Sequence, residues 1–117
     1  MRMNVYAIYD VKADAFMQPL FMVNDDVAIR NFVGACLNPD TPFHLHGQDF
    51  TLFCIDEWDD GKGKFVGDAL HRDLGNGLQL MIQFRDQIEK VQQLQTQIGK
   101  LTDSQQIPGS NGAELNA

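Results

Sequence analysis

The sequence predicts an α+β fold in which an antiparallel sheet of about four strands is followed by a long C-terminal helix. Short apolar runs bounded by turn residues alternate with two segments in which apolar residues recur at helical spacing. The resulting order is strand, strand, helix, strand, strand, helix. Strand pairs joined by short turns favour an antiparallel sheet with its helices on one face.

The first two strands are predicted over residues 4–11 and 16–23, joined by a turn at residues 12–14. Apolar side chains occur at both odd and even positions of the first run, which indicates a strand with both faces covered. Pro19 lies in the second run and has no backbone N–H to donate to a neighbouring strand. We therefore expect the second strand to lie at an edge of the sheet or to break at Pro19.

The clearest helix is predicted between Asn24 and Asn38. Asn24 is suited to cap its N-terminus, and the two aspartates that follow complement the helix dipole. Asn38 precedes Pro39, which disfavours the helical conformation and ends the helix. The apolar face, spaced at i, i+3, i+4, i+7 and i+8, consists of Ile29, Phe32, Val33, Cys36 and Leu37.

The second half of the chain begins with a loop over residues 40–49 and a central strand over residues 50–55, whose two faces are both apolar. A glycine-containing hairpin turn at residues 59–63 leads to a shorter strand over residues 64–70. Acidic residues gather around this turn, and we expect a solvated turn because their spacing does not match a calcium-binding loop. They are Asp56, Glu57, Asp59 and Asp60.

A long helix is predicted over residues 78–101, after a glycine-containing break at residues 75–77. Its apolar residues are Met81, Phe84, Ile88, Val91, Leu94, Ile98 and Leu101. Their steps of 3, 4, 3, 3, 4 and 3 residues place the stripe before Val91 about 80° around the helix from the stripe after it. We expect the first stripe to pack on the sheet, while Leu94, Ile98 and Leu101 form the interface of a homo-oligomer, most simply a homodimer. The alternative, that the domain covers the second stripe by folding the helix back, stays open.

Residues 1–101 are expected to form a single domain, and residues 102–117 a disordered tail that is too polar to bury a core. The sequence has no secretory signal and no apolar run near the roughly 20 residues that span a bilayer, so a soluble protein without a membrane partner is expected. Cys36 and Cys54 lie in apolar runs without the spacing of a metal site or a disulfide framework. We expect two buried thiols in a reducing compartment.

The charge balance argues against a dedicated DNA-coating protein. Nine Lys and Arg residues against sixteen Asp and Glu residues give a net charge of −7, and phosphate binding depends on basic side chains. An aromatic ring and positive charge nevertheless come together where Trp58 lies near Lys62 and Lys64. Bases of single-stranded DNA stack on such rings, so these three residues are the candidate nucleic-acid site. The alternative is that Trp58 covers part of the sheet.

The sequence contains no arrangement typical of catalysis, and we predict a protein that is not an enzyme and uses no cofactor. The serines, Ser104 and Ser110, both lie in the polar tail, where no core holds a nucleophile in place. His44, His46 and Asp49 share one loop, but a metal site needs a further ligand and supporting hydrogen bonds. We therefore predict no metal site.

Four stretches carry a family resemblance: Tyr-Asp-Val-Lys-Ala at 9–13, Asn-Asp-Asp-Val-Ala-Ile-Arg-Asn-Phe at 24–32, Leu-Asn-Pro-Asp-Thr-Pro-Phe at 37–43 and Asp-Phe-Thr-Leu-Phe at 49–53. In them the chain resembles the small non-structural protein of gokushovirus-type microviruses (Microviridae), bacteriophages with circular single-stranded DNA. The resemblance implies a nonstructural viral protein of the host cytoplasm that is associated with DNA replication and is sometimes described as DNA-binding. It supplies no catalytic residues. Arg30 lies in the matched part, opposite the apolar helix face, and is a candidate for binding a partner.

Several functions stay open on these grounds. The first is a phage accessory protein of viral DNA replication or single-stranded genome synthesis, which contacts a phage or host replication protein or binds DNA weakly. The alternative is a true single-stranded-DNA-binding protein. Further alternatives are an inhibitor of a host factor, whose acidic surface mimics DNA, and an enzyme of unrecognised type.

Overall fold

The computed structural model describes residues 2–67 and 71–105, with side chains described as far as Leu101. The chain divides into two compact units, residues 1–84 and residues 85–117. The single domain expected over residues 1–101 stays a prediction. The expected disordered tail lies outside the described residues from 106 onward.

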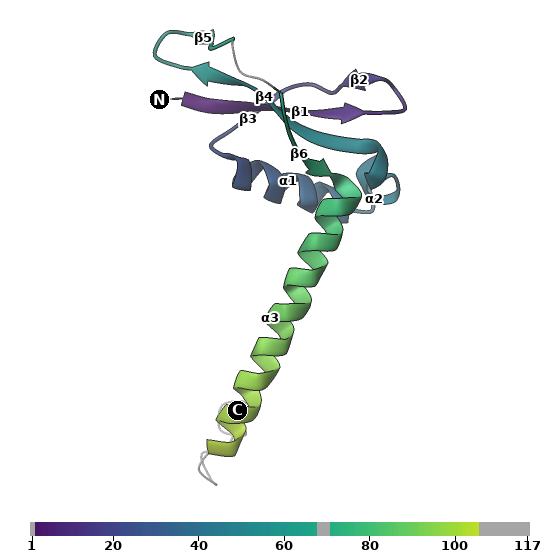
Figure 1. Cartoon of the computed structure of the whole chain (residues 1–117), viewed down its shortest axis with the longest axis vertical. Coiled ribbons are helices and arrows are strands. Elements are labelled where there is room, and N and C mark those ends of the chain that lie inside the picture. Colours follow the sequence, from purple (N-terminus) through teal and green to yellow (C-terminus); the bar gives the residue numbers. More distant parts are fainter. Residues whose placement is uncertain (1, 68–70, 106–117) are drawn as a thin grey trace. The chain divides into compact units, whose positions relative to one another are not determined.

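Six strands form one antiparallel sheet in the described part of the chain (Figure 1). β1 and β4 lie side by side at its centre; β2 and β3 pair with β1, and β5 and β6 pair with β4. The strands are β1 Arg2–Asp10, β2 Ala15–Phe16, β3 Leu20–Met22, β4 Phe50–Asp59, β5 Lys64–Phe65 and β6 Arg72–Asn76. The α+β class with an antiparallel sheet is confirmed, with six strands instead of about four.

The second predicted strand is divided into β2 and β3 around Pro19. Between the two pieces, the Met17 N–H donates to the Ile8 carbonyl oxygen over 2.7 Å. Within the described chain both pieces pair with β1 alone, so they lie at the edge of the sheet. The prediction that proline would break the strand or confine it to an edge is confirmed.

Helix α1, Asp25–Leu37, is capped as predicted, because the Asn24 side-chain oxygen accepts a hydrogen bond from the Val27 N–H over 2.9 Å. Its buried residues are Ala28, Phe32, Val33 and Cys36. Leu37 was expected on this face but is 46% exposed, because it lies about 100° around the helix from Cys36. The sequence pattern also missed Ala28, which is fully buried.

The loop expected over residues 40–49 contains two short helices, α2 Pro42–Leu45 and the 3₁₀ helix η1 Gly47–Asp49. Pro42 occupies the start of α2, where its missing N–H costs no hydrogen bond. Phe43 of α2 packs edge-on against Phe32 at 5.7 Å and Phe50 at 4.7 Å between ring centroids. This segment therefore closes one end of the core, and the expectation of an irregular loop is wrong.

β4 is central, as expected, but runs four residues past the predicted end at residue 55. The strand expected over residues 64–70 is limited to β5, Lys64–Phe65, while residues 68–70 lie outside the described part. β6 was not expected, because Gly75 resembles a break in the sequence. Gly75 has a φ of +125° and lies opposite Leu52 beside an irregularity in the strand pairing.

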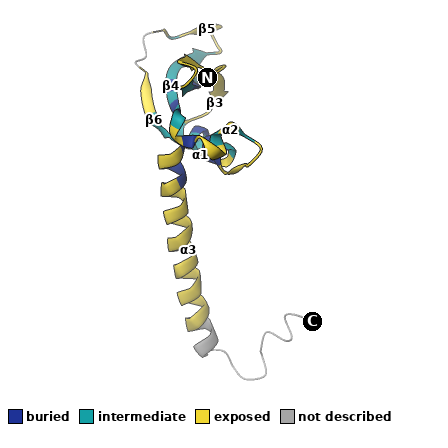
Figure 2. Ribbon diagram, turned by 90° about the vertical axis from the view of Figure 1, so that its right-hand side faces the viewer, coloured by how far each residue is buried: buried dark blue, intermediate teal, exposed yellow. Residues whose placement is uncertain are grey.

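The core lies on one side of the sheet, between α1 and the central strands (Figure 2). Tyr6 and Ile8 of β1 and Leu52 and Cys54 of β4 face α1 and are at most 8% exposed. Glycine allows a close approach at the edge of this core, because a Cβ atom on Gly77 would lie 2.9 Å from the Gly47 carbonyl oxygen. All of this packing lies within residues 1–84.

A polar network fixes the start of α1 on the sheet. The Tyr6 hydroxyl donates to Asp25 Oδ1 over 2.7 Å, and the Arg72 guanidinium donates to both Asp25 oxygens over 2.7 and 3.1 Å. The hydrogen bond from Arg72 lowers the pKa of Asp25, and burial raises the pKa of Tyr6. Asp25 thereby places a negative charge in the first turn of α1 and connects this turn to Tyr6 of β1 and Arg72 of β6.

Helix α3, Gly77–Gln105, begins one residue before its predicted start and ends four residues after its predicted end. Asn76 and Gln79 form a reciprocal cap, in which the Asn76 side chain accepts from the Gln79 N–H over 2.8 Å. Leu80 and Met81 are buried, as expected for Met81, but Phe84 is 36% exposed, so its expected burial is wrong. Within the described residues, no helix has the length and apolar character required to cross a membrane.

Candidate nucleic-acid interface

Aromatic side chains gather on the face of the sheet that points away from α1. Because side chains alternate along a strand, Val5, Ala7 and Tyr9 lie on the face opposite Tyr6 and Ile8. Residues paired directly across strands share a face, which extends this surface over all six strands, including Asp73 of β6 as the partner of Phe53. We term it the open face, defined by Tyr9, Phe16, Phe21, Phe53, Trp58 and Phe65.

The Trp58 cluster, formed by Phe21, Trp58 and Phe65, occupies one end of the open face. The Trp58 ring lies edge-on to Phe65 at 5.1 Å and to Phe21 at 5.9 Å between centroids. The Phe21 and Phe65 rings are stacked at 6.1 Å with an interplanar angle of 30°. Phe21 is 43% and Phe65 is 48% exposed, so the cluster presents ring surface to solvent.

The Phe16 cluster, formed by Tyr9, Phe16, Phe53 and His71, occupies the other end. Phe16 is central, with ring centroids 5.0 Å from Tyr9, 5.6 Å from Phe53 and 5.6 Å from His71. The Tyr9 hydroxyl donates to Asp14, and this hydrogen bond raises the pKa of Tyr9. Phe16 remains 44% exposed.

These rings provide the cover that no described helix gives to this face. Val5 and Ala7 lie beneath them and are each only 1% exposed. Large aromatic rings therefore serve two purposes, because their inner surface buries the sheet and their outer surface stays available. Two clusters of half-exposed rings on one face are a typical contact surface for a partner with flat apolar faces, such as a nucleobase.

The basic residues of the predicted site lie beside the Trp58 cluster, but not all on its face. Lys64 is paired with Asp59, while its neighbour Phe65 is paired with Trp58, so Lys64 and Phe65 point to opposite faces. Lys62 lies in the exposed turn between β4 and β5. The predicted combination of Trp58, Lys62 and Lys64 is therefore divided between the open face and its edge.

Arg2, Lys62 and Lys64 line a shallow pocket of about 160 Å³ at this edge, together with Asp59. Arg2 is already engaged by acidic neighbours, since its guanidinium lies 3.3 Å from a Glu57 oxygen and 4.0 Å from an Asp59 oxygen. The pocket thus has positive charge that is partly neutralised. It could hold a phosphate only weakly.

Two acidic residues of the hairpin hydrogen-bond to its backbone, while residues 60–65 around the turn are exposed, as expected of a solvated turn. Asp56 accepts hydrogen bonds from the Glu57 N–H over 2.7 Å and from the Gly67 N–H over 3.0 Å. Asp59 accepts from the Gly61 N–H over 3.0 Å and from the Lys62 N–H over 3.2 Å. Both carboxylates are half-buried and hold the turn in place.

The other candidate residues are placed away from the open face. His44 of α2 contacts the end of α1, with its Nδ1 3.0 Å from the Cys36 carbonyl oxygen, and His46 is exposed. Among the described residues, no group of three or more His, Cys, Asp or Glu side chains is arranged to hold a metal ion. Cys36 and Cys54 are buried, as predicted, and burial raises the pKa of Cys36 to about 11.

Two further surfaces were singled out by the sequence. Arg30 is exposed on α1, as expected for a residue opposite the buried face. Leu94, Ile98 and Leu101 are 57%, 61% and 62% exposed on α3. Whether these residues bind a partner stays a prediction.

An apolar pocket of about 380 Å³ lies between α1 and the segment that connects β2 to β3. Its lining includes Phe32, Met17 and Met22 and contains no titratable side chain. It has no group suited to acid–base or nucleophilic chemistry. The open face remains the surface with the most exposed aromatic side chains.

Sequence reasoning identified Trp58 but missed its aromatic partners. Phe21 and Phe65 lie in two other strands, and only the register of those strands brings them onto the face of Trp58. Phe53 lies in β4 itself, and the irregularity in the β1–β4 pairing at Val5 and Tyr6 puts it on the same face as Trp58. The only available signal was the alternation of side chains along β1, which puts Val5, Ala7 and Tyr9 on one face. This alternation does not reveal which of the two faces a helix covers.

The family model described as Phage ORF5 protein matches residues 3–80, which include the whole open face. No curated protein and no solved structure matches the chain.

Proposed function

Because the chain belongs to the Phage ORF5 protein family, we propose that it is a non-enzymatic accessory protein of phage DNA replication or single-stranded genome synthesis. The stretches that resemble the gokushovirus-type non-structural protein support a microvirus as its source and the host cytoplasm as its location. They include residues 24–32 and 37–43, which form α1 and lead into α2.

The protein contacts single-stranded DNA through the open face. The observation that carries this proposal is the set of half-exposed rings on the sheet, with Phe21 and Phe65 around the half-buried Trp58 and Phe16 at the other end of the open face. Each base stacked on an aromatic side chain contributes roughly 1–3 kcal/mol and requires no particular sequence. Double-stranded DNA hides its base faces, so the open face selects single strands.

The contact is weak because electrostatic attraction contributes little. The protein carries a net charge of −7, and the basic residues near the Trp58 cluster share their pocket with Asp59. Affinity for non-specific DNA otherwise comes mainly from Lys and Arg neutralising phosphates. We therefore expect a dissociation constant above about 1 μM for mixed-sequence single strands at about 150 mM salt.

Fluorescence provides a direct test, because Trp58 is the single tryptophan of the chain. Titration with an oligothymidine of about 20 nucleotides should quench Trp58 emission at low salt, while a duplex of equal length should not. Phe21→Ala and Phe65→Ala should each weaken the binding about 5- to 100-fold, which corresponds to one lost stacking contact. Leu45→Ala serves as the control, because Leu45 is 80% exposed on α2, whose Phe43 packs against the core. Equal affinity for both DNA forms, or binding unchanged in both phenylalanine variants, would contradict the proposal.

The net charge favours one other candidate function, an acidic inhibitor that occupies the DNA site of a host protein. The same titration separates the two candidates. An inhibitor of this kind would leave Trp58 emission unchanged with any oligonucleotide, even at low salt.

A further inference from the structure

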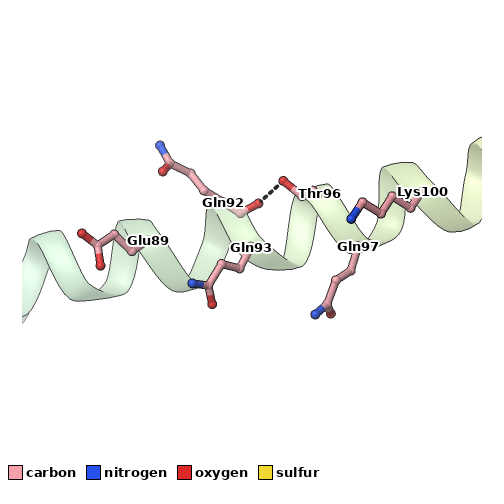
Figure 3. A pocket seen from close by; sticks show the side chains of 6 residues that line it. All are labelled: Glu89, Gln92, Gln93, Thr96, Gln97 and Lys100. Carbon is pink, nitrogen blue, oxygen red and sulfur yellow. Dashed lines mark hydrogen bonds between the residues drawn. The ribbon is translucent and has the colours of Figure 1, made fainter.

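The apolar side chains of α3 that follow Arg85 are exposed along one side of the helix. Val91, Leu94 and Ile98 are between 50% and 61% exposed. The other side is polar, and Figure 3 shows Glu89, Gln92, Gln93, Thr96, Gln97 and Lys100 along it. The Thr96 hydroxyl donates there to the Gln92 carbonyl oxygen over 2.9 Å. An isolated amphipathic helix of this length is marginal in water, so the apolar side needs a partner.

The spacing on the apolar side is that of a coiled-coil seam. The steps from Val91 to Leu94, Ile98 and Leu101 are 3, 4 and 3 residues, which place Val91 and Ile98 at heptad position a and the two leucines at position d. β-Branched residues at position a with leucine at position d favour a parallel pair of helices over coiled coils of three or four helices. Phe84 extends the series by one further a position toward the N-terminus.

Ile88 explains why the apolar residues of the whole helix did not fit one seam. It lies four residues after the a position at Phe84, which makes it an e residue beside the seam. The remaining side chains next to the seam are uncharged at Gln95 and Gln97 and basic at Lys90. In a parallel pair, position g of one helix meets the following e of the other, so Lys90 meets Gln95 and no like charges oppose each other.

The charge of the helix also favours a second copy of this chain as the occupant. Residues 85–101 contain three basic residues and two acidic residues, whereas the whole protein carries −7. The pattern at e and g offers no charges that would select a partner of opposite sign. Two copies can therefore approach along this segment with little of the repulsion that the rest of the chain would cause.

We propose that α3 pairs with α3 of a second copy as a parallel two-stranded coiled coil centred on Val91, Leu94 and Ile98. In a parallel pair, both chains enter the coil from the same end, since residues 1–76 precede the helix in each copy. Two open faces then belong to one assembly. The pairing itself does not depend on DNA, but it would strengthen a weak contact through effective concentration.

Mass measurement by light scattering tests the pairing. The full-length protein should approach twice the monomer mass of 13.2 kDa as its concentration rises. Leu94→Gln combined with Ile98→Gln should give a monomer whose residues 1–84 remain folded, as judged by an unchanged urea transition of the sheet. Gln92→Ala combined with Gln93→Ala is the matched control on the polar side and should leave the dimer intact.

Disulfide trapping tests the orientation. Gln87 occupies position d, so two Gln87→Cys copies should cross-link quantitatively in a parallel coil. In an antiparallel coil centred near Leu94, the two sites would lie roughly 20 Å apart and stay reduced. A mass of 13.2 kDa at every concentration would overturn the pairing, and a dimer that resists this cross-link would overturn the parallel orientation. Neither result depends on DNA, so both are distinguishable from failure of the proposed function.

Discussion

Truncation of Phe32 gives the most quantitative test of how the sheet and α1 are held together. Phe32 is 3% exposed in the centre of the core cluster, so Phe32→Ala removes a whole buried ring. Such truncations cost about 3–5 kcal/mol in packed cores, through lost burial and the cavity that remains. The edge-on contact with Phe43 at 5.7 Å contributes about 0.5–1.5 kcal/mol of the loss.

The neighbouring pocket decides where in this range the effect falls. Phe32 lines the apolar pocket of about 380 Å³, and so do the flexible side chains of Met17 and Met22. Because these methionines can move into the vacated space, the cavity should partly collapse. We therefore expect a loss of about 3–4 kcal/mol, in the lower part of the range.

Urea denaturation monitored by circular dichroism measures this loss, and the melting temperature should fall by about 12–30 °C for a domain of this size. Phe65→Ala removes the same side chain from a site that is 48% exposed, and it should cost less than about 1 kcal/mol. A change below about 1 kcal/mol for Phe32→Ala would mean that α1 does not pack through this face.

Three further outcomes are expected. Arg72→Gln should cost about 1 kcal/mol at neutral pH, because its partly exposed ion pair with Asp25 is screened. Since the pKa of Asp25 is lowered in the folded state, this stability is present above the unfolded pKa of about 3.9 and is lost as the pH falls through the folded value. The stabilities of the wild type and of Arg72→Gln should therefore approach each other as the pH falls below about 3.9, and a constant difference between them would contradict the network. Iodoacetamide at pH 8 should modify Cys36 and Cys54 far more slowly in the native protein than in urea, and equal rates would contradict their burial. In a plot of the logarithm of the single-stranded-DNA binding constant against the logarithm of the salt concentration, the slope should be shallower than about −2. Each neutralised phosphate contributes about −0.7 to this slope, and few basic residues are available; a steeper slope would indicate a basic groove elsewhere.

Local rules predicted the elements whose signals lie within a few residues. Asn24 as the helix cap, Pro19 as the strand break and the apolar spacing of α1 each act through neighbours in the sequence, and the structure has all three. The elements that were missed depend on distant contacts. The short helix α2 forms where Phe43 can reach Phe32, and β6 forms only because β4 offers it a pairing edge.

The candidate site shows the same division. The sequence indicated Trp58 because this aromatic residue lies near two lysines. In the structure, however, Lys64 points to the face opposite Trp58, although the two residues are close in the sequence. The aromatic partners come from β2, β3 and β5, and their meeting is a property of strand register. Without knowing which face α1 covers, no local pattern separates a core phenylalanine from one on the open face.

Photo-crosslinking tests most directly whether the open face contacts single-stranded DNA. An oligothymidine that carries 5-iodouracil at scattered positions would be irradiated with the full-length protein at low salt, and the modified residues identified by mass spectrometry. We predict cross-links at Phe21, Trp58 and Phe65, whose rings form one cluster. Cross-links confined to α1 or α3, or their absence at protein concentrations well above 1 μM, would contradict this prediction.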